Sequence, residues 1–160
     1  MSGSTQIMPR DPQLSFAFEA RVSIAKPLDL GTTRAGHRRV IPILGGTIEG
    51  PRIKGKVLEG GADWQILHSD GAADLEARYT LETDDGALIY VTNRGMRRGS
   101  TDVLKRLNSG EKVDPDQLYF RTYTTFETSA PGYQWLADAV CVGTGERYPE
   151  GVVVRFFQVL

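Results

Sequence analysis

The strongest constraint on the fold is an alternation of apolar and polar positions that begins near Leu14. From residue 16 to residue 24 every second side chain is apolar, and the positions between them are mostly polar or small. A period of two places alternate side chains on opposite faces of an extended chain, so this segment predicts one long, half-buried strand. The apolar positions are Phe16, Phe18, Ala20, Val22 and Ile24. Pro27 is expected to end the strand.

Segments rich in β-branched and aromatic residues continue along the rest of the chain. They predict strands at residues 37–43, 47–49, 52–58, 63–67, 75–83, 87–92, 118–128, 133–142 and 152–160. Closely spaced glycines between residues 45 and 61 would let strands bend or bulge, as the corners of a small barrel require. Asp84-Asp85-Gly86 is a tight-turn signal, and Asn93-Arg94-Gly95 has the same chemistry.

One segment predicts a short helix over one end of the barrel. Ser100 or Thr101 can cap it, and residues 108–110 supply a stop. The apolar residues at helical spacing are Val103, Leu104 and Leu107. Because the strands are long and most connections are short, we expect a mainly β protein with a single antiparallel β-barrel at residues 14–160. Residues 1–13 are polar at most positions and are expected to form a flexible arm.

Composition excludes several classes of partner. The formal net charge is -1, from 19 Lys and Arg against 20 Asp and Glu, and no run of basic residues is longer than two. A duplex-binding protein needs a basic surface, so nucleic acid is not expected as a partner. No apolar stretch approaches the length of a membrane helix, and no signal peptide is visible. Cys141 is the sole cysteine, which fits a reducing compartment, so we expect a cytoplasmic protein without a membrane association.

No motif for a cofactor or metal is present. The glycine-rich stretch lacks the lysine and hydroxyl residues of a phosphate-binding loop, and no serine lies in a nucleophile elbow. His37 and His68 do not have the spacing of metal ligands, although a metal site made of one histidine and carboxylates is an open alternative. Cys141 lies between Val140 and Val142, a setting typical of a buried small hydrophobe. We expect no cofactor and no metal.

An ordered set of short motifs resembles one known family. The set includes Gly45-Gly46, Gly60-Gly61-Ala62-Asp63-Trp64, Ala77-Arg78-Tyr79, Asp85-Gly86, Tyr119-Phe120-Arg121-Thr122, Phe126-Glu127-Thr128 and Trp135-Leu136. The chain from about Phe16 onward is similar to the bacterial and fungal family called UPF-0311, or domain of unknown function 3237. The resemblance implies a calycin-like β-barrel that is often dimeric, without a secure reaction. It carries over Asp63, Trp64, Arg78, Arg121 and Trp135 as family-pattern positions.

Four residues are candidates for catalysis. Asp63 beside an indole could be desolvated, which raises the pKa of a carboxyl group and suits acid–base work, although such an Asp can equally cap a turn. Arg78 and Arg121 lie within strands and could bind an anion if they point into the barrel, whereas strand arginines commonly face solvent. Tyr90 could donate its phenol proton to an oxyanion, or pack in the core.

Further residues are candidates for substrate binding. Trp64 and Trp135 could line an aromatic pocket or pack in the core, and His37 is a weak candidate base. In the strand predicted at residues 118–128, Arg121 shares one face with Tyr119, Tyr123 and Glu127, which are further candidates.

Two functions fit these residues. The first is a cofactor-independent lyase, isomerase or cyclase that uses acid–base chemistry on a small carbonyl or aromatic compound in a ligand-sized barrel pocket. The alternative is a non-catalytic barrel that binds a small organic molecule. The family and the Phe-rich first strand also lead us to expect a homodimer, and light scattering on the purified protein tests that expectation.

Overall fold

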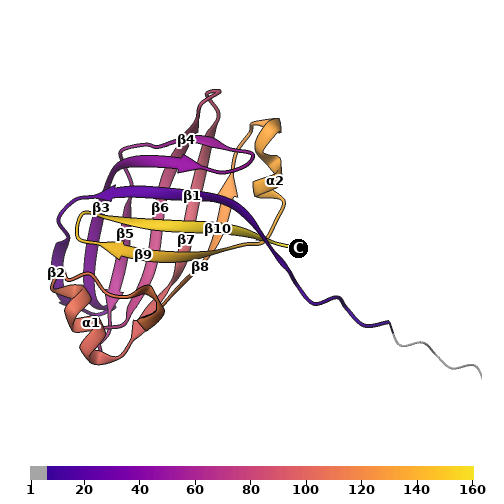
Figure 1. Ribbon diagram of the computed structural model, residues 1–160. Coiled ribbons are helices and arrows are strands. Elements are labelled where there is room, and N and C mark those ends of the chain that lie inside the picture. The colour runs from indigo at the N-terminus through magenta and orange to yellow at the C-terminus, as the bar shows by residue number, and fades with distance from the viewer. Residues whose placement is uncertain (1–6) are drawn as a thin grey trace, which may run out of the picture.

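The computed structural model describes residues 7–160, and ten strands form one antiparallel sheet. The strands are β1 (Leu14–Ile24), β2 (Leu28–Thr33), β3 (Gly36–Glu49), β4 (Lys54–Val57), β5 (Ala62–Leu67), β6 (Ala73–Thr83), β7 (Leu88–Gly99), β8 (Leu118–Glu127), β9 (Cys141–Tyr148) and β10 (Gly151–Val159). The helices are α1 (Thr101–Asn108) and α2 (Gln134–Ala137), with 3-10 turns at Pro115–Gln117 and Pro131–Tyr133. The part of residues 1–13 that is described, 7–13, lies outside any helix or strand, and Figure 1 shows it running away from the barrel.

The sheet closes into a barrel because β1 pairs with both β10 and β3. From β10 the pairing continues through β9, β8, β7 and β6 to β4 and β5, which both lie against β3. β3 bends where it changes partner from β5 to β4, at Gly45 and Gly46, whose φ angles are 140° and 155°. A Cβ at Gly46 would also collide with the backbone of Arg21 in β1, so only glycine fits at this corner. The predicted β-barrel is confirmed.

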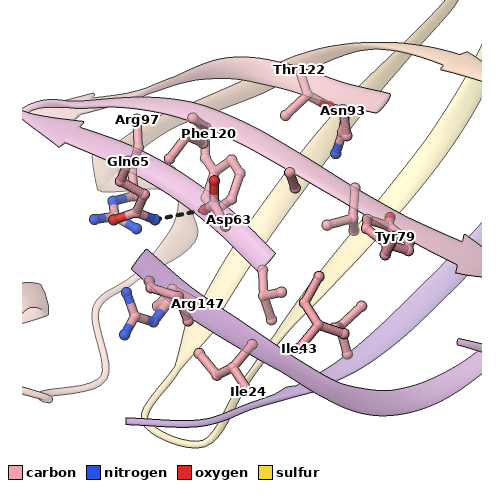
Figure 2. Close-up of a pocket in the computed structure, with 16 residues that line it drawn as sticks. Ile24, Ile43, Asp63, Gln65, Tyr79, Asn93, Arg97, Phe120, Thr122 and Arg147 are labelled. Carbon is pink, nitrogen blue, oxygen red and sulfur yellow. Dashed lines mark hydrogen bonds between the residues drawn. The ribbon is translucent and has the colours of Figure 1, made fainter. Parts of the chain in front are cut away.

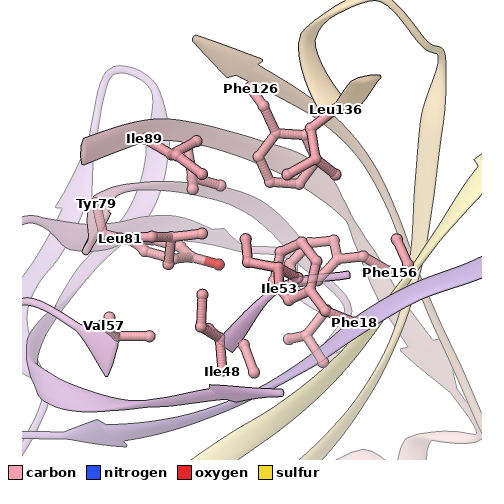
Figure 3. Packing of buried hydrophobic residues seen from close by; sticks show 14 of the residues in the cluster. Phe18, Ile48, Ile53, Val57, Tyr79, Leu81, Ile89, Phe126, Leu136 and Phe156 are labelled. Atoms are coloured by element: carbon pink, nitrogen blue, oxygen red, sulfur yellow. The ribbon is translucent and has the colours of Figure 1, made fainter. Parts of the chain in front are cut away.

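Alternation along each strand fills the barrel interior. In β8, for example, Phe120, Thr122, Thr124 and Phe126 are buried, and the residues that alternate with them are exposed. The end of the barrel beside α2 is packed with apolar side chains, among them Phe18, Phe126 and Phe156 (Figure 3). The opposite end lies beside α1 (Figure 1), and the buried residues there include the polar side chains Arg39, Gln65 and Arg97.

The helix α1 forms as predicted. Ser100 is its N-cap, and its hydroxyl oxygen accepts a hydrogen bond from the Val103 backbone N–H at 3.2 Å. Val103, Leu104 and Leu107 are buried, so the helix packs its apolar side against the protein. Among residues 7–160, no helix is long and apolar enough to cross a membrane.

The sequence-based strand assignment was wrong in several places. Residues 28–33 form β2, which continues alongside β3 after Pro27 and was not expected. Asn93-Arg94-Gly95 is not a turn but lies within β7, paired with β8. Residues 133–140 do not form a strand; they contain α2, and β9 begins only at Cys141. A bulge between Phe16 and Phe18 turns Phe16 outward, where it contacts Phe157.

Candidate functional site

A cavity of about 60 Å³ lies inside the barrel, between its apolar end and its polar end. Pockets that enclose a drug-sized ligand have volumes of about 300 Å³ or more, so the expected ligand-sized pocket is larger than the one observed. Most of the wall is apolar. The lining residues are Val22, Ile24, Ile41, Ile43, Asp63, Gln65, Leu75, Ala77, Tyr79, Asn93, Arg97, Phe120, Thr122, Arg147, Val152 and Val154.

Asp63 brings a carboxylate to the cavity wall. It lies on β5 between Ile41 of β3 and Ala77 of β6, and its side chain points into the barrel (Figure 2). One carboxylate oxygen accepts from the Gln65 amide nitrogen at 2.7 Å, and the other accepts from the Glu76 backbone N–H at 3.0 Å. Burial nevertheless raises the pKa of Asp63, because desolvation outweighs these hydrogen bonds. The expected desolvation is present, and the barrel interior causes it.

Gln65 connects this carboxylate to a buried guanidinium. Its amide oxygen accepts from Arg39 Nε at 3.2 Å and from Arg39 Nη2 at 2.7 Å. Arg39 lies on β3, opposite Gln65, and is 8% exposed. Burial lowers the pKa of Arg39. The three side chains therefore form a chain of hydrogen bonds that holds the Asp63 carboxylate in one orientation.

Two further arginines reach the same end of the cavity. Arg97 on β7 is 1% exposed and donates from Nη2 to the Asn108 side-chain oxygen at 3.4 Å, at the end of α1. Arg147 enters from β9, and its burial lowers the pKa of its guanidinium. The Nε atoms of Arg97 and Arg147 are buried without a hydrogen-bond partner. Burial and the neighbouring charges of Arg147 and Arg39 lower the pKa of Arg97 to about 9.

The other proposed catalytic residues do not reach the cavity. Arg78 lies on the outer surface, where it donates to Glu76 at 2.8 Å, and its side chain is 42% exposed. Tyr90 and Arg121 also lie on the outside of the barrel. The inward orientation expected for Arg78 and Arg121 is wrong, because Tyr79 and Phe120 on the same strands occupy the interior.

The proposed substrate-binding residues also lie away from the cavity. Trp64 points outward from β5, and Trp135 lies on α2 below the guanidinium of Arg52. His37 contacts Asp29 at 2.7 Å at an exposed position. The remaining candidates are exposed on the outer face of β8, and they are Tyr119, Tyr123 and Glu127. Asp63 thus lines the cavity, and the other proposed site residues do not.

Sequence reasoning missed Arg39, Gln65, Arg97 and Arg147. Arg39 shares the parity of Ile41 and Ile43 in a predicted strand, so the signal that it points inward was present. Arg97 was missed because residues 93–95 were interpreted as a turn, which would have ended the strand before Arg97.

In residues 7–160 no group of three or more His, Cys, Asp or Glu side chains is placed to hold a metal ion.

The barrel and its motifs match one family over nearly the whole chain. The model of the family described as protein of unknown function (DUF3237) matches residues 12–159. The chain belongs to this family. A UPF0311 protein of Rhodopseudomonas palustris is 44% identical over 92% of this chain and 97% of its own length. A crystal structure of a conserved protein of unknown function from the same species has a TM-score of 0.90 at 43% identity, over 96% of this chain and 100% of that chain.

A more distant relative is named as an enzyme. The "Hydroalkoxylation enzyme phnH" of Penicillium herquei is 24% identical over 94% of this chain and 86% of its own length. The crystal structure of an enzyme from Penicillium herquei has a TM-score of 0.71 at 23% identity, over 97% of this chain and 99% of that chain. At this identity the likeness establishes a shared barrel fold.

The raised pKa of Asp63 predicts a pH-dependent contribution to stability. The folded protein holds the Asp63 proton more tightly than the unfolded chain, in which the carboxyl has its ordinary pKa of 3.8. The stability contributed by this group is therefore complete below pH 3.8 and declines as the pH rises through the folded-state value. We expect the free energy of unfolding of the wild type, minus that of Asp63→Asn, to fall as the pH rises above the unfolded-state pKa of 3.8. Urea unfolding of both proteins at several pH values measures this difference, and an increase with pH would contradict the assignment.

Proposed function

We propose that this chain is a cofactor-independent enzyme that moves a proton at a small organic molecule bound in the barrel cavity. One observation carries the proposal: Asp63 is a desolvated carboxyl in the cavity wall, which it shares with the guanidinium groups of Arg97 and Arg147. A raised pKa lets a carboxyl group keep its proton to a higher pH and makes its carboxylate a stronger base, so the group suits both donation and acceptance of a proton. The chain of Gln65 and Arg39 holds it in position.

The proposed step is a proton transfer with the negative charge kept on the substrate. Asp63 as a carboxylate accepts a proton from a carbon or hydroxyl group, and the electron pair of the broken bond becomes an enolate or phenolate. Arg97 and Arg147 stabilise that charge, because Arg97 is buried and Arg147 is half-buried, so their guanidiniums act where the dielectric constant is lower than in water. Asp63 then returns the proton to a different atom of the substrate. Isomerisation, cyclisation, dehydration and retro-aldol cleavage can all use this sequence.

The distant relative suggests one member of this group of reactions. Hydroalkoxylation adds the O–H of an alcohol across a carbon–carbon double bond. The addition can pass through a carbocation or, where the alkene is conjugated to a carbonyl, through an enolate. The guanidiniums of the buried Arg39 and Arg97 and of the half-buried Arg147 disfavour a cation and favour an anion. For this chain we therefore propose additions or eliminations beside a carbonyl group.

The non-catalytic binding barrel is the second candidate, and the mostly apolar cavity wall favours it. It needs the same cavity and leaves the bound molecule unchanged. The two candidates differ in whether Asp63 exchanges protons with the ligand.

Hydrogen–deuterium exchange on a panel of small compounds separates the two candidates. Small ketones, unsaturated acids and hydroxy-enones are incubated with the protein in deuterium oxide, and proton NMR follows binding, exchange beside the carbonyl, and ring closure. The wild type is expected to accelerate exchange for at least one compound, and Asp63→Asn is expected not to. Exchange at the uncatalysed rate for every compound that binds would contradict the enzyme and favour the binding barrel.

A further inference from the structure

The guanidinium groups of Arg97 and Arg147 line one end of the cavity, and Arg39 is joined to the same wall by its hydrogen bonds to Gln65. Asp63 supplies a carboxylate to this wall. We call Arg39, Arg97 and Arg147 the arginine cluster; they come from β3, β7 and β9. Figure 2 shows the polar ends of Arg97 and Arg147 beside Gln65, on the side of Asp63 away from Tyr79. Each charge of the cluster acts on at least one other member. Asp63 is the carboxylate that attracts all three, while Asp29, which also attracts Arg39, contacts His37 at the outside.

The hydrogen-bonding capacity of the cluster is largely unused. Within residues 7–160, none of the three forms an ion pair with an Asp or Glu, and their protein acceptors are the side-chain amide oxygens of Gln65 and Asn108. The Nε of Arg97 and of Arg147 and the hydroxyl of Thr122 are buried without partners. Burying a charge without a partner costs several kcal/mol, and a ligand that supplies the counter-charge would offset this cost.

We propose that the arginine cluster is an anion site and that the molecules taken by this cavity are small organic carboxylates. This inference rests on the proposed function and names its substrate class. A planar carboxylate accepts paired N–H bonds from guanidinium groups, and the isoleucine and valine side chains opposite the cluster suit an apolar body. Asp63 lies between Arg97 and Tyr79 in Figure 2. The carbon atoms next to the carboxylate of a ligand bound at the cluster therefore lie beside the Asp63 carboxyl group.

The size of the cavity selects the probe. One water molecule needs about 10–15 Å³ of such a cavity, so a volume of about 60 Å³ holds about four waters, close to the size of propionate with its five non-hydrogen atoms. Its neutral counterpart of nearly the same shape is propionamide. Isothermal titration of both at constant ionic strength separates binding of the charge from binding of the apolar body. The proteins compared are the wild type, Arg147→Gln and Arg121→Gln, the last removing an exposed arginine on the outside of the barrel.

We expect the wild type to bind propionate at least about tenfold more tightly than propionamide, since charge-assisted hydrogen bonds are the stronger ones. Arg147→Gln is expected to weaken propionate binding by about tenfold or more, and Arg121→Gln to leave it unchanged. If Arg147→Gln does not fold, Arg147→Lys keeps the charge but loses the planar fork, and is expected to weaken binding less. Equal binding of propionate and propionamide, or equal binding by wild type and the Arg147 variant, would overturn the inference. Binding of inorganic phosphate without propionate would also overturn it.

One further variant separates this inference from the proposed function. Asp63→Asn removes the carboxylate that competes with the ligand for the cluster, so it is expected to bind propionate as tightly as the wild type or more tightly. If propionate binds and no compound exchanges its protons, the anion site stands and the enzyme proposal fails. If propionate does not bind while neutral ketones exchange in an Asp63-dependent manner, the carboxylate assignment fails and the enzyme proposal stands.

Discussion

Replacing Asp63 with asparagine is expected to lower the rate of proton transfer by about 10²- to 10⁴-fold, the usual contribution of a positioned acid or base. Asparagine has nearly the same shape but cannot give up or accept a proton at neutral pH. The loss corresponds to about 3–5 kcal/mol of transition-state stabilisation, at 1.36 kcal/mol for each tenfold change. Rates of deuterium exchange and of turnover, measured on the same compound, give the value.

The matched control is Asp74→Asn on the adjacent strand. Asp74 is exposed and contacts His68 at 3.0 Å, so this variant removes a carboxylate from the same region without touching the cavity. We expect it to keep the wild-type rate. Circular dichroism and thermal unfolding establish that Asp63→Asn is folded, and the pH profile provides a further readout. The limb of the pH–rate profile that reports ionisation of Asp63 should be absent in Asp63→Asn. A folded Asp63→Asn protein with the wild-type rate would exclude Asp63 from the chemistry.

The sequence predicted the barrel because strand alternation is a local property. The pattern from Phe18 to Val22 follows from the period of an extended chain, and the glycines at the β3 corner follow from backbone sterics. The helix α1 was predicted in the same way, from its Ser100 cap and its apolar spacing. These features depend on neighbours a few residues away.

The site was harder to predict because alternation defines two faces without saying which one is inside. In β8, Tyr119, Arg121 and Tyr123 formed the more conspicuous face, yet the interior holds Phe120 and Thr122. The polar end of the barrel reverses the usual rule, since its inward positions carry arginine and glutamine. Which arginines point inward is decided by the pairing of distant strands, and that pairing is a property of the whole fold.

The phenylalanine cluster at the apolar end is expected to supply much of the stability of the barrel. Phe18 and Phe156 are fully buried with ring centroids 4.7 Å apart, and Phe126 lies 5.7 Å from each of them (Figure 3). Phe156→Ala removes a ring from this cluster and leaves a cavity, at an expected cost of about 3–5 kcal/mol. For a domain of this size that corresponds to a melting temperature lower by about 6–20 °C. Urea and thermal unfolding measure both quantities.

The neighbouring residue provides the control, because Phe157 points to the other side of the same strand. It contacts Phe16 on the outside of the barrel with ring centroids 5.7 Å apart and is only half-buried. Phe157→Ala is therefore expected to cost less than Phe156→Ala, and equal losses would contradict the assignment of inner and outer faces. Asp63, Arg97 and Arg147 line the cavity, whereas Phe18, Phe126 and Phe156 pack at the apolar end of the barrel, and burying the charged groups costs free energy. The packed apolar end offsets that cost, so Phe156→Ala should lower stability while leaving the Asp63-dependent rate of the folded protein unchanged.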